Sequence, residues 1–205
     1  MPMKIFTELD NGKQERIIDA ALKEFAEHGY ENGSTNRIVN KCGISKGSLF
    51  KYFENKEDLY FYLIDTVSAQ MAKETWIDIS TLSKDLYERV IEYSVSEISW
   101  YAANPVKGRF LIGVVSEMGN EIGRKLIERY GDMSTDMYEA LLKGVDMSDL
   151  HNSRREITDI LRWVLTGFNS SFLKSIAGSN DDIETMKKSY IKQLKVHLKV
   201  LKGGL

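Results

Sequence analysis

The chain has 205 residues, of which 42% are hydrophobic and 28% are charged, and its formal net charge is −2. A single cysteine, Cys42, excludes an internal disulfide framework and fits a reducing cytosol, so we expect a cytoplasmic protein. The first twelve residues lack the apolar run of a signal peptide, and stretches such as "FLIGVV" at 110–115 are too short to span a membrane.

Only two prolines, Pro2 and Pro105, interrupt a chain rich in Leu, Lys, Glu and Ile, which indicates a mostly helical protein. The first predicted helix covers residues 13–28. It is amphipathic, and Gly29 follows in the position where glycine commonly ends a helix. Its apolar face consists of residues at helical spacing, namely Ile17, Ile18, Ala21, Leu22 and Phe25.

Two short helices come next. Ser34 or Thr35 is the predicted N-cap of the first, whose inner face is formed by Ile38, Val39 and Cys42. Gly43 ends this helix after about two turns. Ser45 is the predicted N-cap of the second, which carries Leu49, Phe50 and Phe53 at spacings of three and four residues and ends near Phe53.

Asn55 is the predicted N-cap of a longer fourth helix that begins at Lys56. Further helical patterns cover residues 81–103, 105–117, 119–144, 153–177 and 181–202. We therefore expect an all-α fold of about nine helices. An N-terminal three-helix domain, residues 1–55, is joined to a C-terminal helical bundle, residues 56–205, and the fourth helix connects the two.

The stretch from Ser34 to Phe53 contains four cationic side chains and no Asp or Glu, although the whole chain is slightly acidic. A helix, a turn containing glycine and a second helix form the helix-turn-helix arrangement, whose second helix enters the major groove of DNA. Gly47 costs about 1 kcal/mol relative to alanine inside a helix. A glycine there makes sense where the backbone must approach another surface closely, and lysines beside it can meet phosphates.

The segment "RIIDAALKEFAEHGYENGSTNRIVNKCGISKGSLFKYFENKEDLY" resembles the N-terminal DNA-binding domain of the TetR family of transcriptional repressors. The resemblance covers about residues 13–60, and the remaining length and helical pattern suit the family's regulatory domain. The matching elements are Ile18, Ala21, Phe25, Gly29-Tyr30, Ser34-Thr35, Ile38, Gly43-Ile44-Ser45, Gly47, Leu49-Phe50, Phe53, Asn55-Lys56-Glu57 and Leu59.

The resemblance implies a set of DNA-binding residues in and around the two short helices. Phosphates would be held by Ser34 or Thr35, by Lys46 and by Lys56 at the start of the fourth helix. Gly47, Ser48 and Lys51 would approach the bases. With the flanking positions, the predicted DNA-binding set is Ser34, Thr35, Arg37, Ser45, Lys46, Gly47, Ser48, Phe50, Lys51, Tyr52 and Lys56.

Several of these positions carry their own expectations. Lys46, Gly47, Ser48, Lys51 and Tyr52 are expected on or beside the outer face of the recognition helix. Phe50 stands where the family often has a tyrosine, which removes a phenolic contact to phosphate. Arg37 stands where an acidic residue often completes a capping box. Because a cation is unfavourable near a helix N-terminus, Arg37 is either an added phosphate contact or a solvated surface charge.

Residues with other chemistry are scattered. Cys42 lies on an inner helix face and reads as a small buried hydrophobe, with a redox role as the alternative. His28, His151 and His197 have no partners at metal-ligand spacing, so we expect no metal site and no cofactor. Neither a glycine-rich phosphate loop nor a clustered catalytic set is present in the sequence, and we expect the protein not to be an enzyme.

The C-terminal part is rich in aromatic residues, which form either the core of the bundle or the wall of an apolar ligand cavity. By the resemblance, such a cavity would lie among helices four to seven. The predicted ligand-binding residues are Trp76, Tyr93, Trp100, Phe110 and Tyr130. We expect a small apolar or amphipathic effector, such as a lipid-like acid, an aromatic compound or a lipophilic cation.

The last two helices carry long apolar stripes, which are either intrachain core or a subunit interface. TetR-like proteins use these two helices for a four-helix dimer interface, so the resemblance implies a homodimer. A two-fold dimer also places two recognition helices one DNA turn apart, about 34–36 Å, on a palindromic operator. The predicted interface residues are Val164, Phe168, Phe172, Tyr190 and Leu194.

These features together predict a sequence-specific DNA-binding transcriptional regulator, a repressor that a small ligand releases from its operator. Ligand binding in the bundle would favour a spacing of the two DNA-binding domains that no longer fits the operator. The first alternative is a TetR-like regulator without a small-molecule ligand, controlled by a protein partner or acting as an activator. The second alternative is an enzyme that uses the helical bundle as its catalytic site.

Overall fold

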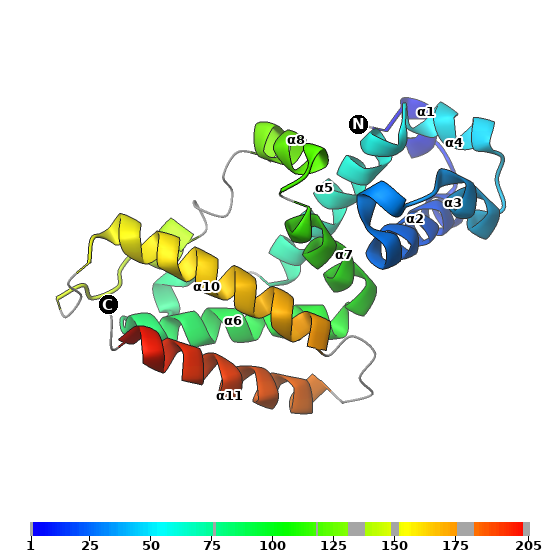
Figure 1. Cartoon of the computed structure of the whole chain (residues 1–205). Helices are drawn as coiled ribbons and strands as arrows, with labels where there is room; N and C mark the ends of the chain where they lie inside the picture. The colour runs from blue at the N-terminus through cyan, green and yellow to red at the C-terminus, as the bar shows by residue number, and fades with distance from the viewer. Residues whose placement is uncertain are drawn as a thin grey trace. The chain divides into compact units, whose positions relative to one another are not determined.

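A computed structural model of the chain describes residues 2–75, 77–117, 119–130, 138–148, 152–175 and 183–202. All regular structure in these ranges is helical (Figure 1), which confirms the predicted all-α class. Residues 138–141 are helical as well. In chain order the elements are α1 (Lys4–Thr7), α2 (Asn11–Asn32), α3 (Thr35–Cys42), α4 (Lys46–Tyr52), α5 (Lys56–Glu74), the 3-10 helix η1 (Ile79–Thr81), α6 (Leu86–Ala103), α7 (Pro105–Ser116), α8 (Glu121–Tyr130), α10 (Arg154–Ser175) and α11 (Ile183–Lys202).

Several elements differ from the sequence prediction. The short helix α1 was not predicted; it forms because Phe6 is fully buried and its ring lies 4.8 Å from that of Phe53. The helix α6 begins at Leu86 instead of residue 81, because the carboxylate of Asp85 accepts hydrogen bonds from the N–H groups of Tyr87 and Glu88, each at 2.9 Å. The predicted single helix 119–144 is wrong in its last residues, since 142–144 form a turn, and residues 131–137 lie outside the described ranges.

The chain divides into two compact units. Unit 1 contains residues 1–74 and 104–125, and unit 2 contains residues 75–103 and 126–205. The chain therefore passes between the units at residues 74–75, 103–104 and 125–126. Unit 1 is larger than the expected N-terminal domain, because α5 and α7 pack with the three-helix segment. A boundary at residue 55 stays a prediction about the minimal DNA-binding domain.

The core of unit 1 lies under the two short helices. The helix α2 packs against α3, α5 and α7, while α1 packs against α4. The ring of Tyr60 makes an edge-to-face contact with that of Phe25 at 5.0 Å and with that of Phe110 at 5.4 Å. Aromatic contacts of this kind stabilise a core by about 0.5–1.5 kcal/mol beyond their area burial. They join α2, α5 and α7, which together support α3 and α4.

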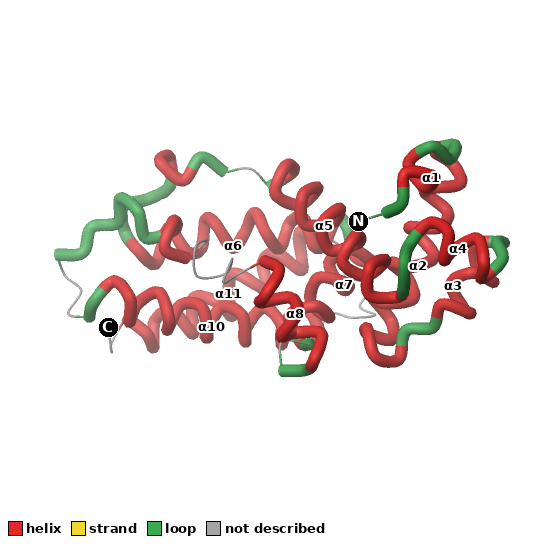
Figure 2. The backbone as a smooth tube through the Cα atoms, turned by 90° about the horizontal axis from the view of Figure 1, so that it is seen from above, coloured by secondary structure: helices red, strands yellow, loops and turns green. Residues whose placement is uncertain are grey.

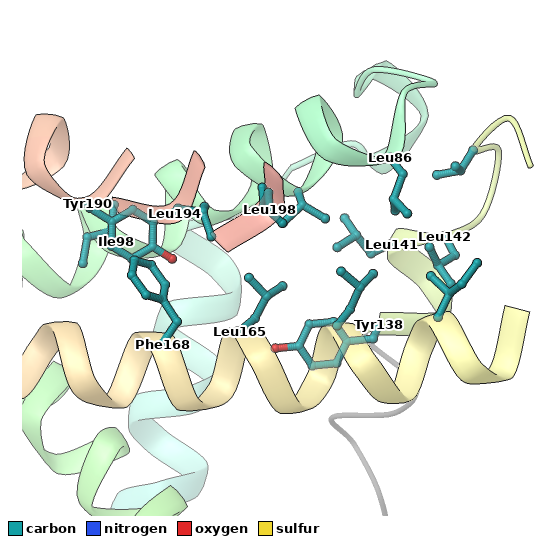
Figure 3. Close-up of a cluster of buried hydrophobic side chains, with 14 of the residues drawn as sticks. Leu86, Ile98, Tyr138, Leu141, Leu142, Leu165, Phe168, Tyr190, Leu194 and Leu198 are labelled. Carbon is teal, nitrogen blue, oxygen red and sulfur yellow. The ribbon is translucent and has the colours of Figure 1, made fainter. Parts of the chain in front are cut away.

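The core of unit 2 is formed by three long helices. Figures 1 and 2 show α6, α10 and α11 running side by side, and α11 packs closely along α6. Figure 3 shows Phe168 of α10 pointing toward Tyr190 of α11 and Ile98 of α6, with Leu165 of α10 and Tyr138 of the helical residues 138–141 in the same cluster. All five side chains are buried. The core therefore uses one face of each long helix, as their apolar stripes predict.

A buried arginine joins several backbone segments at one end of this core by hydrogen bonds. Arg89 is 2% exposed, and its guanidinium donates only to backbone carbonyls at distances between 2.6 and 3.1 Å. The five acceptors are the carbonyl oxygens of Ile79, Leu82, Ser83, Leu141 and Lys143. Because all five donors of a buried guanidinium need partners, this arrangement holds the segments before and after α6 in place.

Candidate DNA-binding site

The turn between α3 and α4 has the geometry of a helix-turn-helix. Gly43 ends α3 in the left-handed conformation with φ of 69°, and its N–H donates to the carbonyl of Val39. The N–H of Ile44 donates to the same carbonyl at 3.1 Å. Only glycine adopts this conformation at low cost, so Gly43 redirects the chain sharply into α4.

Serine side chains start both helices, as the sequence predicts. The hydroxyl of Ser34 accepts a hydrogen bond from the N–H of Arg37 at 3.4 Å, and that of Ser45 accepts from the N–H of Ser48 at 3.0 Å. Asn55 caps α5 in the same way, since its side-chain oxygen accepts from the N–H of Asp58 at 2.8 Å. Such caps satisfy the unpaired N–H groups of the first helical turn and fix where each helix begins.

The helix α4 presents an apolar face to the core and a cationic face to solvent. Leu49 is 1% exposed, whereas Ser45, Lys46, Gly47 and Lys51 are exposed. Among the described residues, neither lysine forms an ion pair, so both charges are available to a polyanion. The outer face of α4 therefore matches the predicted recognition surface.

Phe50 and Tyr52 lie on different sides of α4. Phe50 is 37% exposed, and the ammonium of Lys46 lies 6.0 Å from the centre of its ring. Tyr52 was expected on or beside the outer face, but it is only 6% exposed, and its ring lies 5.9 Å from that of Phe6. That expectation is wrong because the unpredicted helix α1 covers this side of α4. Phe50, and not Tyr52, is the aromatic residue that α4 presents to solvent.

Arg37 lies beside a buried carboxylate that the sequence analysis missed. Glu24 of α2 is fully buried, and its Oε1 accepts from Nε of Arg37 at 2.7 Å and from the N–H of Ser34 at 3.0 Å. Lys41 adds an ion pair to Oε2 at 3.4 Å. Arg37 also donates to the carbonyl of Asn32 at 2.7 Å. Arg37 thus holds the first turn of α3 against α2, and its phosphate contact stays a prediction.

The charge state of Glu24 follows from these contacts. Burial raises the pKa of its carboxyl, but the hydrogen bonds from Arg37 and Ser34 and the nearby charges of Arg37 and His28 outweigh burial, so the pKa lies below its usual range. The carboxylate therefore stays ionised. A sequence signal for this site exists, since Glu24 interrupts the apolar face between Ala21 and Phe25, and two cations follow at helical spacing on α3.

The ammonium of Lys56 is bound by backbone carbonyls of its own chain. Its ammonium donates to the carbonyls of Tyr30 at 2.8 Å, Glu31 at 3.3 Å and Gly33 at 3.3 Å, and it lies 4.4 Å from the centre of the Tyr30 ring. An ammonium has three donors, and all three are used here. Lys56 therefore joins the start of α5 to the end of α2, and its predicted phosphate contact stays a prediction. Thr35, the remaining member of the set, is half-buried at the start of α3.

The predicted ligand-binding residues do not all lie in one unit. Phe110 belongs to unit 1, where it is 1% exposed and packs on Tyr60. Tyr93, Trp100 and Tyr130 belong to unit 2, and Trp76 lies outside the described residues. Trp100 is buried, and its ring lies 5.8 Å from that of Tyr101. Glu97, which the sequence does not single out, also lies on α6, and its side chain is hydrogen-bonded to that of Tyr93.

The predicted dimer-interface residues are mostly intrachain core. Phe168, Phe172, Tyr190 and Leu194 are all less than a tenth exposed, and Val164 is half-buried. The hydroxyl of Tyr190 donates to the side-chain oxygen of Asn169 at 2.6 Å, which joins α11 to α10 within the chain. The exposed apolar residues of these helices are instead Trp163, Val196 and Val200. The apolar stripes therefore serve the core, which is the alternative that the pattern left open.

A shallow groove lies between α10 and α11 on the side where these helices are exposed. It has a volume of about 530 Å³. The residues that line it are Val164, Gly167, Phe168, Ser171, Phe172, Ser175, Gln193 and His197. Phe168 and Phe172 thus reach both the core and the groove. Gly167 has open space where a Cβ would lie, so another helix can approach α10 at this point.

Other chemistry is not supported by the described residues. Within the described ranges, no group of three or more His, Cys, Asp or Glu side chains is arranged to hold a metal ion. The described helices also include none whose length and hydropathy suffice to cross a lipid bilayer. Cys42 is buried, and burial raises the pKa of its thiol, which disfavours the reactive thiolate.

Comparison with known proteins places the helix-turn-helix in a family. The model of bacterial regulatory proteins of the TetR family matches residues 17–63. An HTH-type transcriptional regulator of Staphylococcus aureus is 31% identical over 133 residues, which cover 65% of this chain and 69% of that protein. The HTH-type transcriptional repressor AcnR of Corynebacterium diphtheriae is 40% identical over 73 residues, which cover 36% of this chain and only 38% of the repressor.

A solved structure extends the likeness to the whole fold. The chain is similar to a TetR family transcriptional regulator from Chloroflexus aurantiacus, with a TM-score of 0.71 and 20% identity over 100% of this chain and 98% of that one. The relatives are transcriptional regulators and not enzymes, in agreement with the sequence prediction. From its helix-turn-helix, its all-helical fold and these relatives, the chain belongs to the TetR family of DNA-binding transcriptional regulators.

Proposed function

We propose that the protein is a homodimeric repressor that binds a palindromic operator through α4 and is released when a small molecule binds to unit 2. The observation that carries the DNA-binding part is the outer face of α4, where Lys46, Gly47 and Lys51 are exposed and where no acidic residue intervenes between Ser34 and Phe53. One relative, AcnR, is named a transcriptional repressor. We therefore propose that the protein represses transcription and does not activate it.

The residues of the interface have different roles in this proposal. Gly47 and Ser48, in the first turn of α4, approach the edges of the bases in the major groove. Lys46 and Lys51 contact phosphates, and their charges supply affinity that depends on salt. Thr35 and Ser34, at the start of α3, lie where a phosphate contact would fix the register of the protein on the duplex. Phe50 adds an exposed ring beside Lys46.

Dimerisation follows from the geometry of a palindromic operator, which needs two recognition helices about 34–36 Å apart. The exposed apolar residues Trp163, Val196 and Val200, which are 65%, 61% and 75% exposed, support an interface on α10 and α11. Gly167 and the groove beside it allow close approach of a second pair of helices. The interface of this proposal therefore uses the outer faces of the two helices and leaves Tyr190 and Leu194 in the core.

An effector site in unit 2 is supported by its side chains. Tyr93, Glu97 and Tyr101 of α6 are half-buried, and burial raises the pKa of each of the three groups. Apolar walls with a few polar groups are typical of small-molecule sites. A solved structure of the same fold, FadR from Bacillus subtilis, holds stearoyl-CoA; it has a TM-score of 0.61 and is 19% identical over 88% of this chain. These side chains and this ligand support an apolar or amphipathic effector.

The switch would act through the segment 104–125. It belongs to unit 1, yet the chain enters it from unit 2 and returns to unit 2 at its end. A ligand that binds one conformation of unit 2 more tightly shifts the population of the whole chain toward that conformation. Because the coupling of two binding sites is reciprocal, a ligand that weakens operator binding must itself bind less tightly in the presence of the operator.

The experiment is selection of bound sequences from random duplex DNA by the full-length protein, followed by titration of the selected site. The proposal expects a near-palindromic site and two protomers bound per duplex, as measured by sedimentation. Recovery of no enriched sequence, or of a site that one protomer saturates, would contradict it. A palindromic site from which no small molecule releases the protein would instead favour control by a protein partner.

A further inference from the structure

The N-terminus of α3 lacks the acidic residue that completes a capping box. In that motif the N-cap serine accepts a hydrogen bond from the N–H of the third helical residue, and an acidic side chain at that third position accepts from the N–H of the serine. Ser34 is the N-cap of α3 and its hydroxyl accepts from the N–H of Arg37 at 3.4 Å, but Arg37 is a cation. The second hydrogen bond of the motif therefore needs an acceptor from elsewhere in the chain.

Glu24 of α2 supplies this acceptor. Its Oε1 accepts from the N–H of Ser34 at 3.0 Å, so the preceding helix makes the hydrogen bond that the third residue of α3 cannot make. The same oxygen accepts from Nε of Arg37 at 2.7 Å, and Oε2 forms an ion pair with Lys41 at 3.4 Å. A fully buried carboxylate of unit 1 thus contacts both the N-cap and two cations of α3.

The two cations reach the surface although the carboxylate does not. The side chains of Arg37 and Lys41 are 48% and 46% exposed, whereas the side chain of Glu24 has no exposed surface. Two positive charges in direct contact with one negative charge leave a positive charge in excess at this contact. Solvent or a ligand can therefore reach the cations, while their buried partner stays out of reach.

The contacts fix the guanidinium of Arg37 and leave some of its donors unused. Nε is bonded to Glu24, while Nη2 donates to the carbonyl of Asn32 at 2.7 Å and also pairs with Glu24. Within the described ranges Nη1 donates no hydrogen bond, and the ammonium of Lys41 makes one. A guanidinium whose plane is fixed beforehand loses less freedom when it binds an anion. Arg37 and Lys41 therefore offer preorganised donors.

The position of α3 in the helix-turn-helix identifies the anion. Arg37 is the third residue of α3 and Lys41 is the seventh, so the two cations lie one turn apart on one face of the helix. The first helix of a helix-turn-helix crosses the phosphate backbone of DNA while the second enters the major groove. Here α3 is the first helix, and it packs against α4. Two cations in a row along α3 therefore suit neighbouring phosphates of one DNA strand.

We propose that Glu24 is a positioning residue for DNA binding, which holds Arg37 and Lys41 so that both contact phosphates of the operator. This inference rests on the proposed binding of a duplex by α4, and it adds the residues that anchor α3 to the DNA backbone. Glu24 itself does not touch the DNA, because it is fully buried. Its negative charge is needed, because hydrogen bonds between ionised groups are stronger than those to a neutral side chain and hold the cations in place.

The test measures the affinity of the full-length protein for its selected duplex as a function of salt concentration. Arg37→Met and Lys41→Met should each weaken binding about tenfold and lower the slope of log affinity against log salt by about one unit, because each loses a phosphate contact. Glu24→Gln removes a negative charge, which by simple electrostatics strengthens DNA binding, yet we expect binding about tenfold weaker. Arg37→Met should then weaken Glu24→Gln by less than about twofold, because Arg37 is no longer held.

Two further variants separate positioning from charge and from folding. Glu27→Gln is the matched control, because it removes an exposed carboxylate of the same helix whose charge also reaches Arg37. It should bind the duplex at least as tightly as the wild type. Arg37→Lys changes a half-exposed side chain and keeps its charge, but an ammonium cannot reproduce the planar fork that contacts Glu24, Asn32 and a phosphate together. It should bind about fivefold more weakly.

Each other outcome overturns the inference. Binding by Glu24→Gln that equals or exceeds wild-type binding would show that the carboxylate only neutralises charge. Where Glu24→Gln does not fold, an unchanged salt slope for Arg37→Met or wild-type affinity of Arg37→Lys would exclude the phosphate contact by itself. A full tenfold effect of Arg37→Met on top of Glu24→Gln would reduce Glu24 to a support of the fold. A wild type with no preferred duplex would contradict the proposed function, whereas a lower slope for Lys51→Met but not for Arg37→Met would contradict this inference alone.

Discussion

The carboxylate of Glu117, at the end of α7, accepts a hydrogen bond from the backbone N–H of Tyr30 at 2.6 Å. Gly29 makes this contact possible. Its φ of 69° and ψ of −176° break α2, and a Cβ at this position would lie 2.8 Å from Oε1 of Glu117. The conformation and the close approach both require glycine. Glu117 therefore caps the last turn of α2 from another helix and links α7 to the DNA-binding segment.

The contact predicts an unequal effect of two glycine substitutions. Gly29→Ala should lower the free energy of unfolding by about 2–4 kcal/mol, because it adds backbone strain and displaces Glu117. Gly43→Ala has the same φ of 69° but open space around the new Cβ, and should cost only about 1–2 kcal/mol. Chemical denaturation measures both. Adding Glu117→Ala to Gly29→Ala should recover part of the loss, and no recovery would show that strain alone explains it.

Glu97 should make stability depend on pH. Its folded-state pKa of about 7 lies above the ordinary value of 4.5, so ionisation of this group disfavours the folded state as the pH rises between these values. The wild type should therefore lose about 1–3 kcal/mol relative to Glu97→Gln between pH 5 and pH 8. Urea denaturation at both pH values tests this. The exposed Glu88→Gln should show no such pH dependence, and a flat difference for Glu97→Gln would contradict a raised pKa of this carboxyl.

Substitution of Lys51 and of Lys56 should have opposite effects on DNA binding and on stability, because only Lys51 is proposed to contact a phosphate. Lys51→Met should reduce the slope of log affinity against log salt by about one unit, and should change stability by less than about 0.5 kcal/mol. Lys56→Met should instead destabilise the protein by about 1–3 kcal/mol, because three carbonyls lose their donor, while the salt slope stays unchanged. A reduced salt slope for Lys56→Met would instead indicate that Lys56 contacts a phosphate, as the sequence predicts.

The dimer interface is best tested at an exposed position. Trp163 is 65% exposed in the single chain, so Trp163→Glu should leave the fold intact and place an unpaired charge in the interface. Dimer affinity should fall by about a hundredfold, or about 2.7 kcal/mol, as measured by sedimentation. Ile127→Glu is the control, since Ile127 is 51% exposed on α8. A Trp163→Glu protein as dimeric as the wild type would exclude this face.

The sequence predicts the helix-turn-helix well because its signals are local. Ser34, Gly43 and Ser45 begin or end helices through contacts within a few residues, and the structure has all three in those positions. The long-range contacts are not visible in this way. In the sequence Glu24 has the appearance of an ordinary surface charge, and only the fold places Arg37 of α3 beside it. Likewise, only the fold places the carbonyls at the end of α2 around the ammonium of Lys56.

The contacts of the C-terminal part are less visible in the sequence for a related reason. An apolar stripe on a helix has the same appearance whether it faces its own chain or a second one, so Tyr190 and Leu194 were assigned to an interface although they are buried in the core. Aromatic residues indicate a ligand site in the sequence, whereas nothing local distinguishes Glu97 from the other charged residues of its segment. Its burial depends on helices that are distant in sequence, which periodicity alone does not bring together.

The first turn of α4 is proposed to face DNA, and Gly47→Glu places a carboxylate on this surface. Gly47 has a helical backbone, and a Cβ there would meet only the Ser45 hydroxyl at 3.9 Å, so the chain itself has room for a side chain. A glutamate in this first turn is favourable for the helix by about 0.5–1 kcal/mol. The variant should therefore be at least as stable as the wild type.

The measurement is the affinity of Gly47→Glu for the selected operator beside that of Gly119→Glu, which adds the same side chain at another exposed glycine with open space around it. Gly47→Glu should lose operator affinity by about a hundredfold or more, because a carboxylate then faces the phosphates and base edges, while Gly119→Glu should bind like the wild type. A stable Gly47→Glu protein that binds the operator with wild-type affinity would contradict the placement of α4 in the major groove.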